Sequence, residues 1–582
     1  MNDFVKYLNS MNSAKSESKN ALAESQLMEE YYSRIEVKRE ISSKITSYLK
    51  KNEGIENEAI ILTGHAGDGK TSILIQVLEE FGYFEGGKRP LKIEEEYNGL
   101  YYIKDMSELS EDQQKNLLMK FLSCKDYGMS SIIVSNTGPI INTFKALFND
   151  EVSNIEIEQK ILAGINNVIS DPITISSKGK SFKFRMVNIA NIDNAYMIEQ
   201  ILLKVLNKEL WKECFVCENC CKCPINNNYD MVSENIDDVA DKISKIYFWL
   251  SERGSRLTIR QMLAHITFSL TSNLECEKIN NFDDSETMKN KYSFVNGFFG
   301  AYHDKTLRDN ALNIKPIKEL SLLGLDQKSF GKFDDELFIK ESYNVFPEMI
   351  KERVIKVIKA TGEGISDNTY VASMLRNEIR RYFILFAKDA LNQIEIENTI
   401  ISEPFMDYYR AVANDSAYTK AVHRKLEKVV FDALYRYFIG VYPSKTEENL
   451  YVTLRKDFNV VQNTQMLIAK VPRDDISIVL EEKEDKAEPE KIDNRMFLKI
   501  GNKGKFLITS EFLEYMFKFY EGNVFTNLQP SFSYGISKLK TQIMREYKVR
   551  DKEKLTLIII QNEKIGKMKI EVDEEEGQLI IT

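Results

Sequence analysis

Between residues 59 and 200, short apolar runs alternate with segments whose apolar residues recur every three or four positions. A short continuous apolar run is typical of a strand buried on both faces, and the three-to-four spacing is typical of a helix. Strands that alternate with helices in this way indicate parallel β–α units in a doubly wound sheet. We expect residues 83–99 to be a polar loop. The predicted strands are 59–63, 100–105, 131–136 and 182–190, and the predicted helices are 70–81, 112–122 and one after a turn at 137–139.

The spacing of apolar and polar residues changes at Gly440. Before it, helical spacing dominates, and after it alternating polar and apolar residues predict strands with two helices among them. We expect a charged loop at 481–491 and a terminal hairpin around Glu576-Gly577. The predicted parts are a helical N-terminal segment at 1–58, an α/β core at 59–200, a cysteine-rich knuckle with a helical lid at 201–330, a helical domain at 331–440 and a C-terminal α+β domain at 441–582.

The junction between the first predicted strand and helix reads Gly64-His-Ala-Gly-Asp-Gly-Lys-Thr71. Gly-x4-Gly-Lys-Thr between a strand and a helix is the pattern of a P-loop, although a chance glycine turn is the plainer alternative. Glycines let the backbone wrap a phosphate chain, and the helix adds its positive N-terminal end. We expect Lys70 to bind the β- and γ-phosphates of ATP and the Thr71 hydroxyl to hold Mg²⁺. The predicted nucleotide-binding residues are Gly64, His65, Ala66, Gly67, Asp68, Gly69, Lys70, Thr71 and Ser72.

Hydrolysis also needs an acid that holds Mg²⁺ and a group that positions water. Asp105 ends the second predicted strand, where strand ends meet a phosphate site, and Glu108 follows one turn later. We predict that Asp105 is the second Mg²⁺ ligand and that Glu108 polarises the attacking water. The plainer interpretation makes Asp105 a helix N-cap, and Asp105 follows a lysine where an uninterrupted apolar run is usual.

Two further polar residues complete the predicted catalytic set. Asn136 ends the next strand, where an amide could contact the γ-phosphate. The order of the strands, with Asn136 after Asp105, matches the sensor position of AAA+ ATPases. Arg260 resembles the AAA+ lid arginine that responds to the nucleotide state, with Arg256 as the alternative. The plainer interpretations are a turn residue for Asn136 and a solvated charge for the arginine. The predicted catalytic residues are thus Lys70, Asp105, Glu108, Asn136 and Arg260.

Five of the seven cysteines lie between Cys214 and Cys223. Cys-x2-Cys pairs place two sulfurs on one side of a tetrahedron, which favours Zn²⁺. The spacing is also close to that of an iron–sulfur ferredoxin, and a metal-free cluster is a third possibility. We expect a structural zinc site rather than a catalytic one. Its predicted ligands are Cys214, Cys217, Cys220 and Cys223.

Composition narrows the function classes. The chain has 582 residues, 43% of them apolar, and a net charge of −9, which argues against a protein that coats DNA by bulk attraction. No long apolar segment predicts a membrane span, and no leader-like segment opens the chain. Clustered cysteines indicate a reducing compartment. We therefore expect a cytoplasmic protein without a membrane partner.

Histidine is scarce, with four in the chain. His265 lies in a predicted helix among apolar neighbours. This setting is typical of a core histidine rather than a metal ligand.

Three segments together resemble a bacterial family. The glycine loop, Ile103-Lys-Asp-Met-Ser-Glu108 and Cys214-x2-Cys217-x5-Cys223-Pro-Ile225 are similar to those of the ATPase component (DndF/DptF type) of DNA phosphorothioation-dependent restriction systems. The resemblance covers roughly residues 1–340. It implies an antiviral defence complex, with DndG/DptG-like and DndH/DptH-like partners, that restricts DNA lacking backbone sulfur. The resemblance leaves open whether this chain contacts DNA directly, and the net charge of −9 favours contact through the complex.

Two functions follow as hypotheses. The first is an AAA+-like α/β P-loop ATPase, binding ATP, Mg²⁺ and Zn²⁺, in which nucleotide turnover changes the contacts of core and lid with partner subunits or with a second copy of the chain. The second is a regulatory switch that holds ATP without sustained turnover and controls complex assembly. An adaptor with a vestigial nucleotide site is a third class, against which the intact Gly69-Lys70-Thr71 argues.

Overall fold

A computed structural model describes most of the chain. The described residues are 2–12, 30–50, 57–87, 89–106, 109–148, 153–177, 179–280, 282, 284–362, 364–444, 447–454, 462–482, 490, 494–502, 504–523, 529–549, 554–561, 564–573 and 578–582. The chain divides into two compact units. Unit 1 comprises Met1–Ile396 with Asp485–Lys491, and unit 2 comprises Glu397–Glu484 with Ile492–Thr582.

Unit 1 contains a six-stranded sheet in the order β2-β3-β4-β1-β6-β5. The four central strands are parallel, as the apolar runs predicted, and Ile61 of β1 lies opposite Ile133 of β4 and Met186 of β6. Both edge strands are antiparallel to their neighbours, so the sheet is mixed rather than fully parallel. The strands are β1 Ala59–Thr63, β2 Glu94–Tyr97, β3 Leu100–Ile103, β4 Ser130–Val134, β5 Ile173–Ser177 and β6 Lys180–Asn188.

The expected loop at 83–99 is therefore wrong in its second half, which forms β2. Only Asn98 and Gly99 separate β2 from β3, and both have positive φ, 47° and 77°. An Asn-Gly pair in this conformation makes the tight turn that joins antiparallel strands. The turn expected at 137–139 is also wrong, because α7 begins at Thr137. Pro139 lies in its first turn, where a helix does not need the missing N–H.

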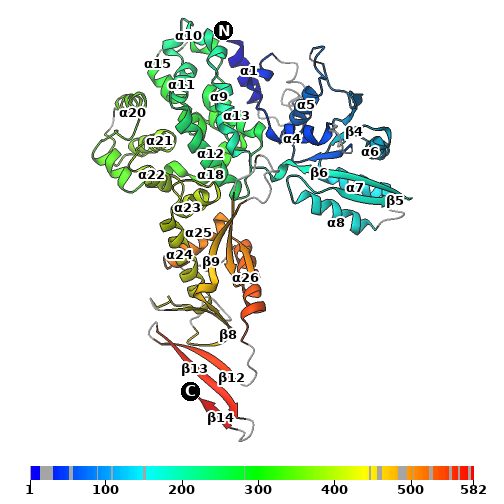
Figure 1. Ribbon diagram of the computed structural model, residues 1–582. Helices are drawn as coiled ribbons and strands as arrows, with labels where there is room; N and C mark the ends of the chain where they lie inside the picture. The colour runs from blue at the N-terminus through cyan, green and yellow to red at the C-terminus, as the bar shows by residue number, and fades with distance from the viewer. Residues whose placement is uncertain are drawn as a thin grey trace. The chain divides into compact units, whose positions relative to one another are not determined.

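Helices cover both faces of this sheet (Figure 1). On one face, α4 and α5 pack their apolar residues against alternate positions of the central strands, including Ile60 and Leu62. On the other face, α6, α7 and α8 pack against Ile61 and Ile133. Strands buried on both faces explain the continuous apolar runs of the sequence. The bounds are α4 Glu40–Leu49, α5 Lys70–Glu80, α6 Glu111–Ser123, α7 Thr137–Phe148 and α8 Asn154–Ile165.

The remainder of unit 1 is helical. Among the described residues, no helix is both long enough and apolar enough to cross a membrane. His265 is fully buried in α13, which confirms the expected core histidine. The further helices are α1 Asp3–Met11, α3 Tyr32–Ile35, α9 Ile198–Val205, α10 Lys212–Phe215, α11 Pro224–Ser233, α12 Ile236–Glu252, α13 Ile259–Thr271, α14 Cys276–Ile279, α15 Ser285–Lys291, α16 Phe294–Phe299, α17 Lys305–Leu312, α18 Lys315–Leu323, α19 Lys332–Asp334, α20 Glu348–Thr361, α21 Tyr370–Phe386 and, across the boundary of the units, α22 Gln393–Ile400.

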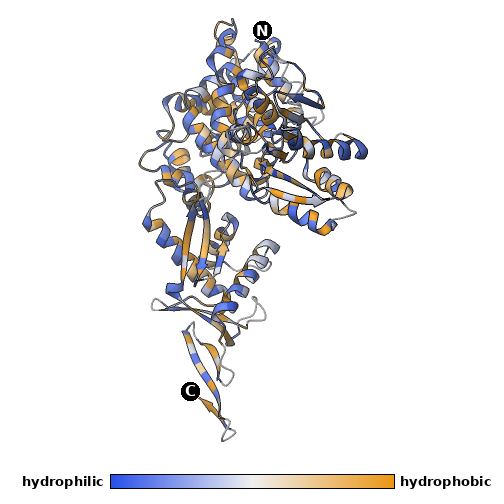
Figure 2. Cartoon of the chain, turned by 45° about the vertical axis from the view of Figure 1, so that its right-hand side comes forward, coloured by the Kyte–Doolittle hydropathy of each residue, from blue (hydrophilic) through white to orange (hydrophobic). Residues whose placement is uncertain are grey.

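Unit 2 combines helices with two antiparallel sheets, in the orders β11-β10-β9 and β14-β13-β12-β8-β7. The predicted terminal hairpin is confirmed in the pairing of β13 with β14, and its tip, at Glu576 and Gly577, lies outside the described residues. Hydrophilic and hydrophobic residues alternate along β13 (Figure 2). The elements are α23 Glu403–Val412, α24 Lys420–Ile439, β7 Asn449–Thr453, β8 Thr464–Pro472, β9 Ile476–Glu482, β10 Asn494–Ile500, β11 Gly504–Leu507, α25 Ser510–Tyr520, α26 Pro530–Tyr547, β12 Lys554–Gln561, β13 Lys564–Asp573 and β14 Gln578–Ile581.

Candidate functional site

The glycine loop, Gly64 to Lys70, joins the C-terminal end of β1 to the N-terminus of α5. Gly67 and Gly69 have φ of 87° and 89°, a region that only glycine enters at no steric cost. The first N–H groups of α5 have no partner within the helix and carry the positive end of its dipole. The loop therefore offers several backbone donors to an anion at one end of the sheet.

Lys70 lies at the centre of this site. Its ammonium donates to the carbonyl oxygens of Gly64 (2.9 Å) and His65 (3.0 Å), and to Oδ1 of Asn136 (2.9 Å). Burial lowers the pKa of Lys70, and Arg260 adds to the effect, whereas Asp68 and Asp105 oppose it. The side chain is thus surrounded by the groups that the sequence predicted for a nucleotide site.

The ends of β1, β3 and β4 bring these groups together because parallel strands finish at the same edge of a sheet. Asn136 lies two residues after the end of β4, and Asp105 lies two residues after the end of β3. The N–H of Met106 donates to the carbonyl of Val134 (3.0 Å), which keeps the two strand ends together. Of the predicted catalytic residues, Lys70, Asn136, Asp105 and Arg260 therefore lie in one neighbourhood. Glu108 lies outside the described residues.

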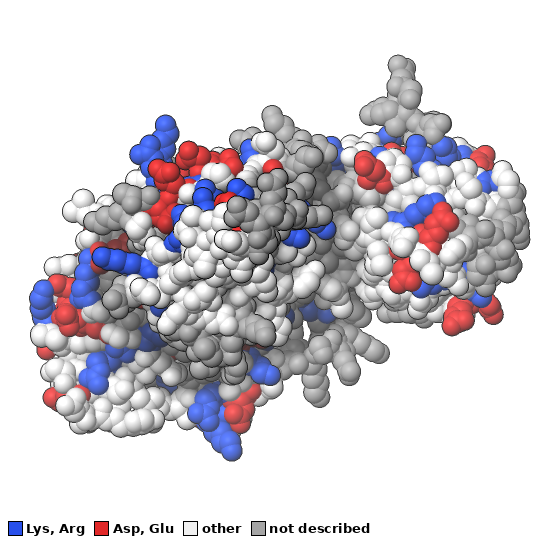
Figure 3. Space-filling model, turned by 90° about the horizontal axis from the view of Figure 1, so that it is seen from below, with Lys and Arg blue, Asp and Glu red and all other residues white. Residues whose placement is uncertain are grey.

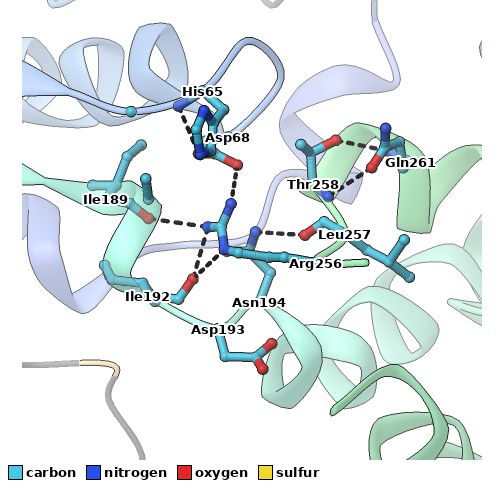
Figure 4. Close-up of polar contacts among 12 residues, drawn as sticks. His65, Asp68, Ile189, Ile192, Asp193, Asn194, Arg256, Leu257, Thr258 and Gln261 are labelled. Carbon is cyan, nitrogen blue, oxygen red and sulfur yellow. Dashed lines mark hydrogen bonds and ion pairs between the residues drawn. The ribbon is translucent and has the colours of Figure 1, made fainter. Parts of the chain in front are cut away.

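Asp68 links the glycine loop to the helical part of unit 1. Its carboxylate accepts a hydrogen bond from the backbone N–H of His65 (2.9 Å) and forms an ion pair with Arg256 (2.8 Å). Figure 4 shows the Arg256 guanidinium between Asp68 and the carbonyl groups of Ile189 and Ile192, to which it also donates. The Asp68 side chain has no exposed surface, so the pair is shielded from water.

The N-terminus of α13 lies against the same loop. Thr258 and Gln261 form a capping box there, and a Cβ on Gly67 would come within 3.1 Å of the Thr258 Oγ1 atom. Arg260 is the second residue of this helix, and burial lowers its pKa. A partly desolvated arginine beside Lys70 gives the site a second cation with a planar set of donors.

The remaining residues of the predicted loop have different settings. His65 and Ala66 are exposed, and the Ser72 hydroxyl accepts a hydrogen bond from Tyr32 (3.2 Å). Thr71 is half-buried at the second position of α5. Its hydroxyl belongs to the first turn of the helix, the position from which a P-loop threonine holds Mg²⁺.

One residue that sequence reasoning missed is Arg39. Its Nη1 atom lies 3.9 Å from the position of a Cβ on Gly69, and its guanidinium is paired with Glu490 at 2.7 Å. Both side chains are 2% exposed. Glu490 belongs to the segment Asp485–Lys491 of unit 1. No local pattern signals a contact between residues this far apart in the chain.

The cysteine cluster lies at α10, α11 and the short segment between them. Cys214, Cys220 and Cys223 are partly buried, whereas Cys217 and Cys221 are exposed. Within the described residues, no three His, Cys, Asp or Glu side chains are grouped so that they could hold a metal ion. The zinc ligands expected from the spacing stay a prediction.

Comparison of the chain with protein-family models, with curated proteins and with solved structures gives no significant match. The fold itself defines the class as α/β: a mixed sheet with parallel central strands and helices on both faces. Function has to be argued from the glycine loop and the side chains that surround Lys70.

Proposed function

We propose that this chain binds ATP with Mg²⁺ at the glycine loop and hydrolyses it, as an AAA+-like P-loop ATPase. The observation that supports this most directly is the environment of Lys70. Its ammonium is held by two loop carbonyls and Asn136, and it lies within the electrostatic reach of Asp105 and Arg260. A phosphate group is the ligand that a buried lysine, an arginine and a helix N-terminus have in common.

Each side chain then has a role. Lys70 moves its donors from the loop carbonyls to the β- and γ-phosphate oxygens, while Thr71 and Asp105 hold Mg²⁺. Asn136, released from Lys70, contacts the γ-phosphate or orients the attacking water, and Glu108 polarises that water. Arg260 stabilises the charge that develops on the transferred phosphoryl group.

The Asp68–Arg256 ion pair suggests how nucleotide binding is communicated. Arg256 is bonded both to the loop and to the carbonyls of Ile189 and Ile192 after β6. When the loop adjusts to phosphate, Arg256 therefore transmits the movement both to the start of α13 and to the segment after β6. This coupling is the change between core and lid that an ATPase of this class uses to remodel its contacts.

The biological setting that we propose is a bacterial anti-phage complex that restricts DNA lacking phosphorothioate modification. Partner subunits of the DndG/DptG and DndH/DptH type then supply most of the DNA contact. On the face in Figure 3, the described basic and acidic side chains lie in small mixed groups. Together with the net charge of −9, this supports contact with DNA through the complex.

The second candidate function is a nucleotide-gated switch that senses an infection cue and controls assembly without sustained turnover. The sequence before Asp105 favours it, because Lys104 interrupts the apolar run that usually precedes a Mg²⁺-binding acid. The two functions share the nucleotide site and differ in whether phosphate is released.

The experiment is calorimetric titration with MgATP together with phosphate-release assays, with and without modified or unmodified duplex DNA. Lys70→Ala is expected to weaken binding by about 100-fold, equivalent to about 3 kcal/mol, because a charged donor to the phosphates is lost. Lys305→Ala, at an exposed lysine of α17, is the matched control and should bind as the parent does. Binding without phosphate release would favour the switch, and unchanged binding by Lys70→Ala would contradict the proposal.

A further inference from the structure

The segment from Cys214 to Cys223 is a series of tight turns. The N–H of Cys217 donates to the carbonyl of Cys214 (3.4 Å), and the N–H of Cys223 donates to that of Cys220 (3.3 Å). Each Cys-x2-Cys stretch thus turns back on itself, as zinc knuckles do. Cys223 then caps the start of α11, where Pro224 is the first helical residue.

A sixth cysteine, Cys276, comes from a distant part of the chain. Helix α1 contacts both its segment and the segment from Cys214 to Cys223. At one end of α1, the Asn2 amide donates to the Cys214 Sγ atom (3.3 Å). At the other end, the Asn9 amide donates to the carbonyl of Leu274 (2.8 Å), two residues before Cys276. A helix rises about 1.5 Å per residue, so these two contacts are about 10 Å apart along α1.

A second contact joins the two segments directly. Asn219, in the middle of the cysteine segment, donates a hydrogen bond to the side chain of Asn280, which ends α14. Cys276 is the first residue of that same short helix. The segment from Cys214 to Cys223 therefore contacts the C-terminal end of α14, the short helix that Cys276 begins.

The thiols also interact electrostatically. Burial raises the pKa of Cys214 to about 11, and Cys276 and Cys217 add to the rise, while the Asn2 amide opposes it. Burial raises the pKa of Cys223 to about 12, the backbone N–H groups of Asn226 and Ile225 oppose it, and Cys214 and Cys276 add to it. Cys276 therefore lies in the field of both partly buried knuckle thiols.

Cys220 has a different environment from Cys214 and Cys223. Its Sγ atom is 3.6 Å from that of its neighbour Cys221, and this pairing is the main cause of its raised pKa. Cys276 instead contributes to the raised pKa values of Cys214 and Cys223.

We propose that Cys214, Cys217, Cys223 and Cys276 form a tetrahedral Zn²⁺ site, with Cys276 in the position that spacing alone assigned to Cys220. Four thiolates are the ligand set of a closed structural zinc site, and zinc displaces their protons on binding. Because the thiols are not yet grouped closely enough to coordinate, binding includes a closure of the turns between Cys214 and Cys223. Zinc then links α10, α11 and α14 near the start of α1, where the Asn2 amide donates a hydrogen bond to the Cys214 sulfur.

The test measures zinc in the full-length chain by elemental analysis and competition with a chelator, and counts thiolate ligands from the visible spectrum of the Co²⁺-substituted protein. Cys276→Ser should lower the zinc affinity by well over tenfold, since even the loss of an outer-shell partner costs about 10–100-fold. It should also remove one thiolate from the Co²⁺ spectrum. Cys220→Ser and Cys221→Ser should keep both the metal and the four-thiolate spectrum, and circular dichroism checks that every variant is folded.

Three results would overturn the proposal. Loss of zinc in Cys220→Ser with retention in Cys276→Ser would show that Cys220, and not Cys276, is the fourth ligand. Iron with a broad visible absorbance band would make the site an iron–sulfur centre. A parent protein that binds neither Zn²⁺ nor Co²⁺ would show that the thiols have no metal to hold.

Discussion

At the scale of single residues, the candidate nucleotide site depends on charges that compensate one another out of contact with water. Asp68 has no exposed side-chain surface, and Arg256 is 19% exposed. Shielded charges are stable only when they are paired and hydrogen-bonded. The loop conformation and the arginine before α13 therefore depend on each other.

Arg256→Gln is expected to destabilise the protein by about 3 kcal/mol, because it leaves the Asp68 carboxylate buried without its cation. Thermal denaturation measures the loss. Arg308→Gln, at an exposed arginine of α17, is the control and should change stability little. Adding Asp68→Asn to Arg256→Gln should recover part of the loss, and two strictly additive substitutions would argue against the ion pair.

The buried His265 makes the stability of unit 1 sensitive to pH. Its Nε2 lies 2.8 Å from the carbonyl of Phe298, which only accepts, so Nε2 carries the hydrogen and Nδ1 accepts from the Tyr247 hydroxyl (2.7 Å). Burial lowers the pKa of His265 from 6.5 to about 4, although the bond to Phe298 opposes the shift.

Because the unfolded chain binds this proton more tightly, stability should be complete above pH 6.5 and should fall as the pH decreases towards 4. The gap between the two pKa values corresponds to about 3 kcal/mol. Denaturant titrations of the parent and of His265→Gln across this range test it. The variant should lose part of the slope, and His303→Gln, at an exposed histidine, should keep it.

At the scale of elements, α16 and α13 approach closely through Gly297. A Cβ at this position would lie 2.8 Å from the Cα of Ser269 and 3.0 Å from its carbonyl oxygen. Backbone atoms cannot move aside as a side chain can, so the two helices would have to separate. Gly535 in α26 is a suitable comparison, since the nearest atom that a Cβ there would meet outside its chain neighbours is 3.5 Å away, in the Phe506 ring, an ordinary van der Waals distance.

Gly297→Ala should therefore destabilise the protein by about 1–3 kcal/mol, despite the better helix propensity of alanine. Gly535→Ala should instead stabilise it by up to about 1 kcal/mol, because alanine restricts the unfolded chain and fits the helix. Equilibrium unfolding in urea measures both changes. Equal effects of the two substitutions would show that the α13–α16 contact is looser than the structure describes.

At the scale of the whole molecule, the chain divides into two compact units, and the candidate nucleotide site belongs to unit 1. A ligand stabilises the part of a protein that binds it, by about 2.7 kcal/mol at 100 times Kd. Nucleotide binding should therefore have a local signature rather than a uniform one.

Hydrogen exchange tests this expectation. With MgATP at 100 times Kd, amides of residues 59–72 and 256–262 should exchange up to about 100-fold more slowly, while the strands of unit 2 keep their rates. At the same MgATP concentration, Lys70→Ala should reduce the slowing to about twofold, because its weaker binding leaves the site half occupied. Slower exchange that appears first in β7 to β14 would locate the nucleotide elsewhere.

The sequence by itself determined the local features of this protein. Apolar runs with helical segments between them predicted the central strands and α5 to within two residues at each end, because strands buried on both faces are rich in apolar residues. The glycine pattern predicted the loop, because φ near +90° at Gly67 and Gly69 admits little else. The Asn98-Gly99 pair is a hairpin signal from which β2 could have been predicted. Its run of three glutamates lacks the apolar residues by which the other strands were recognised.

Only the tertiary structure decided which distant residues meet. The sequence offered Arg260 and Arg256 as candidate arginines, and only the structure shows that Arg256 forms an ion pair with Asp68. The pair of Arg39 with Glu490 had no signal in the sequence at all. The residues on either side of Cys276 likewise contact α1 and the Cys214–Cys223 segment, which no local pattern indicated. Local patterns record the conformation and burial of each segment, whereas pairing across the chain depends on how packed elements meet in space.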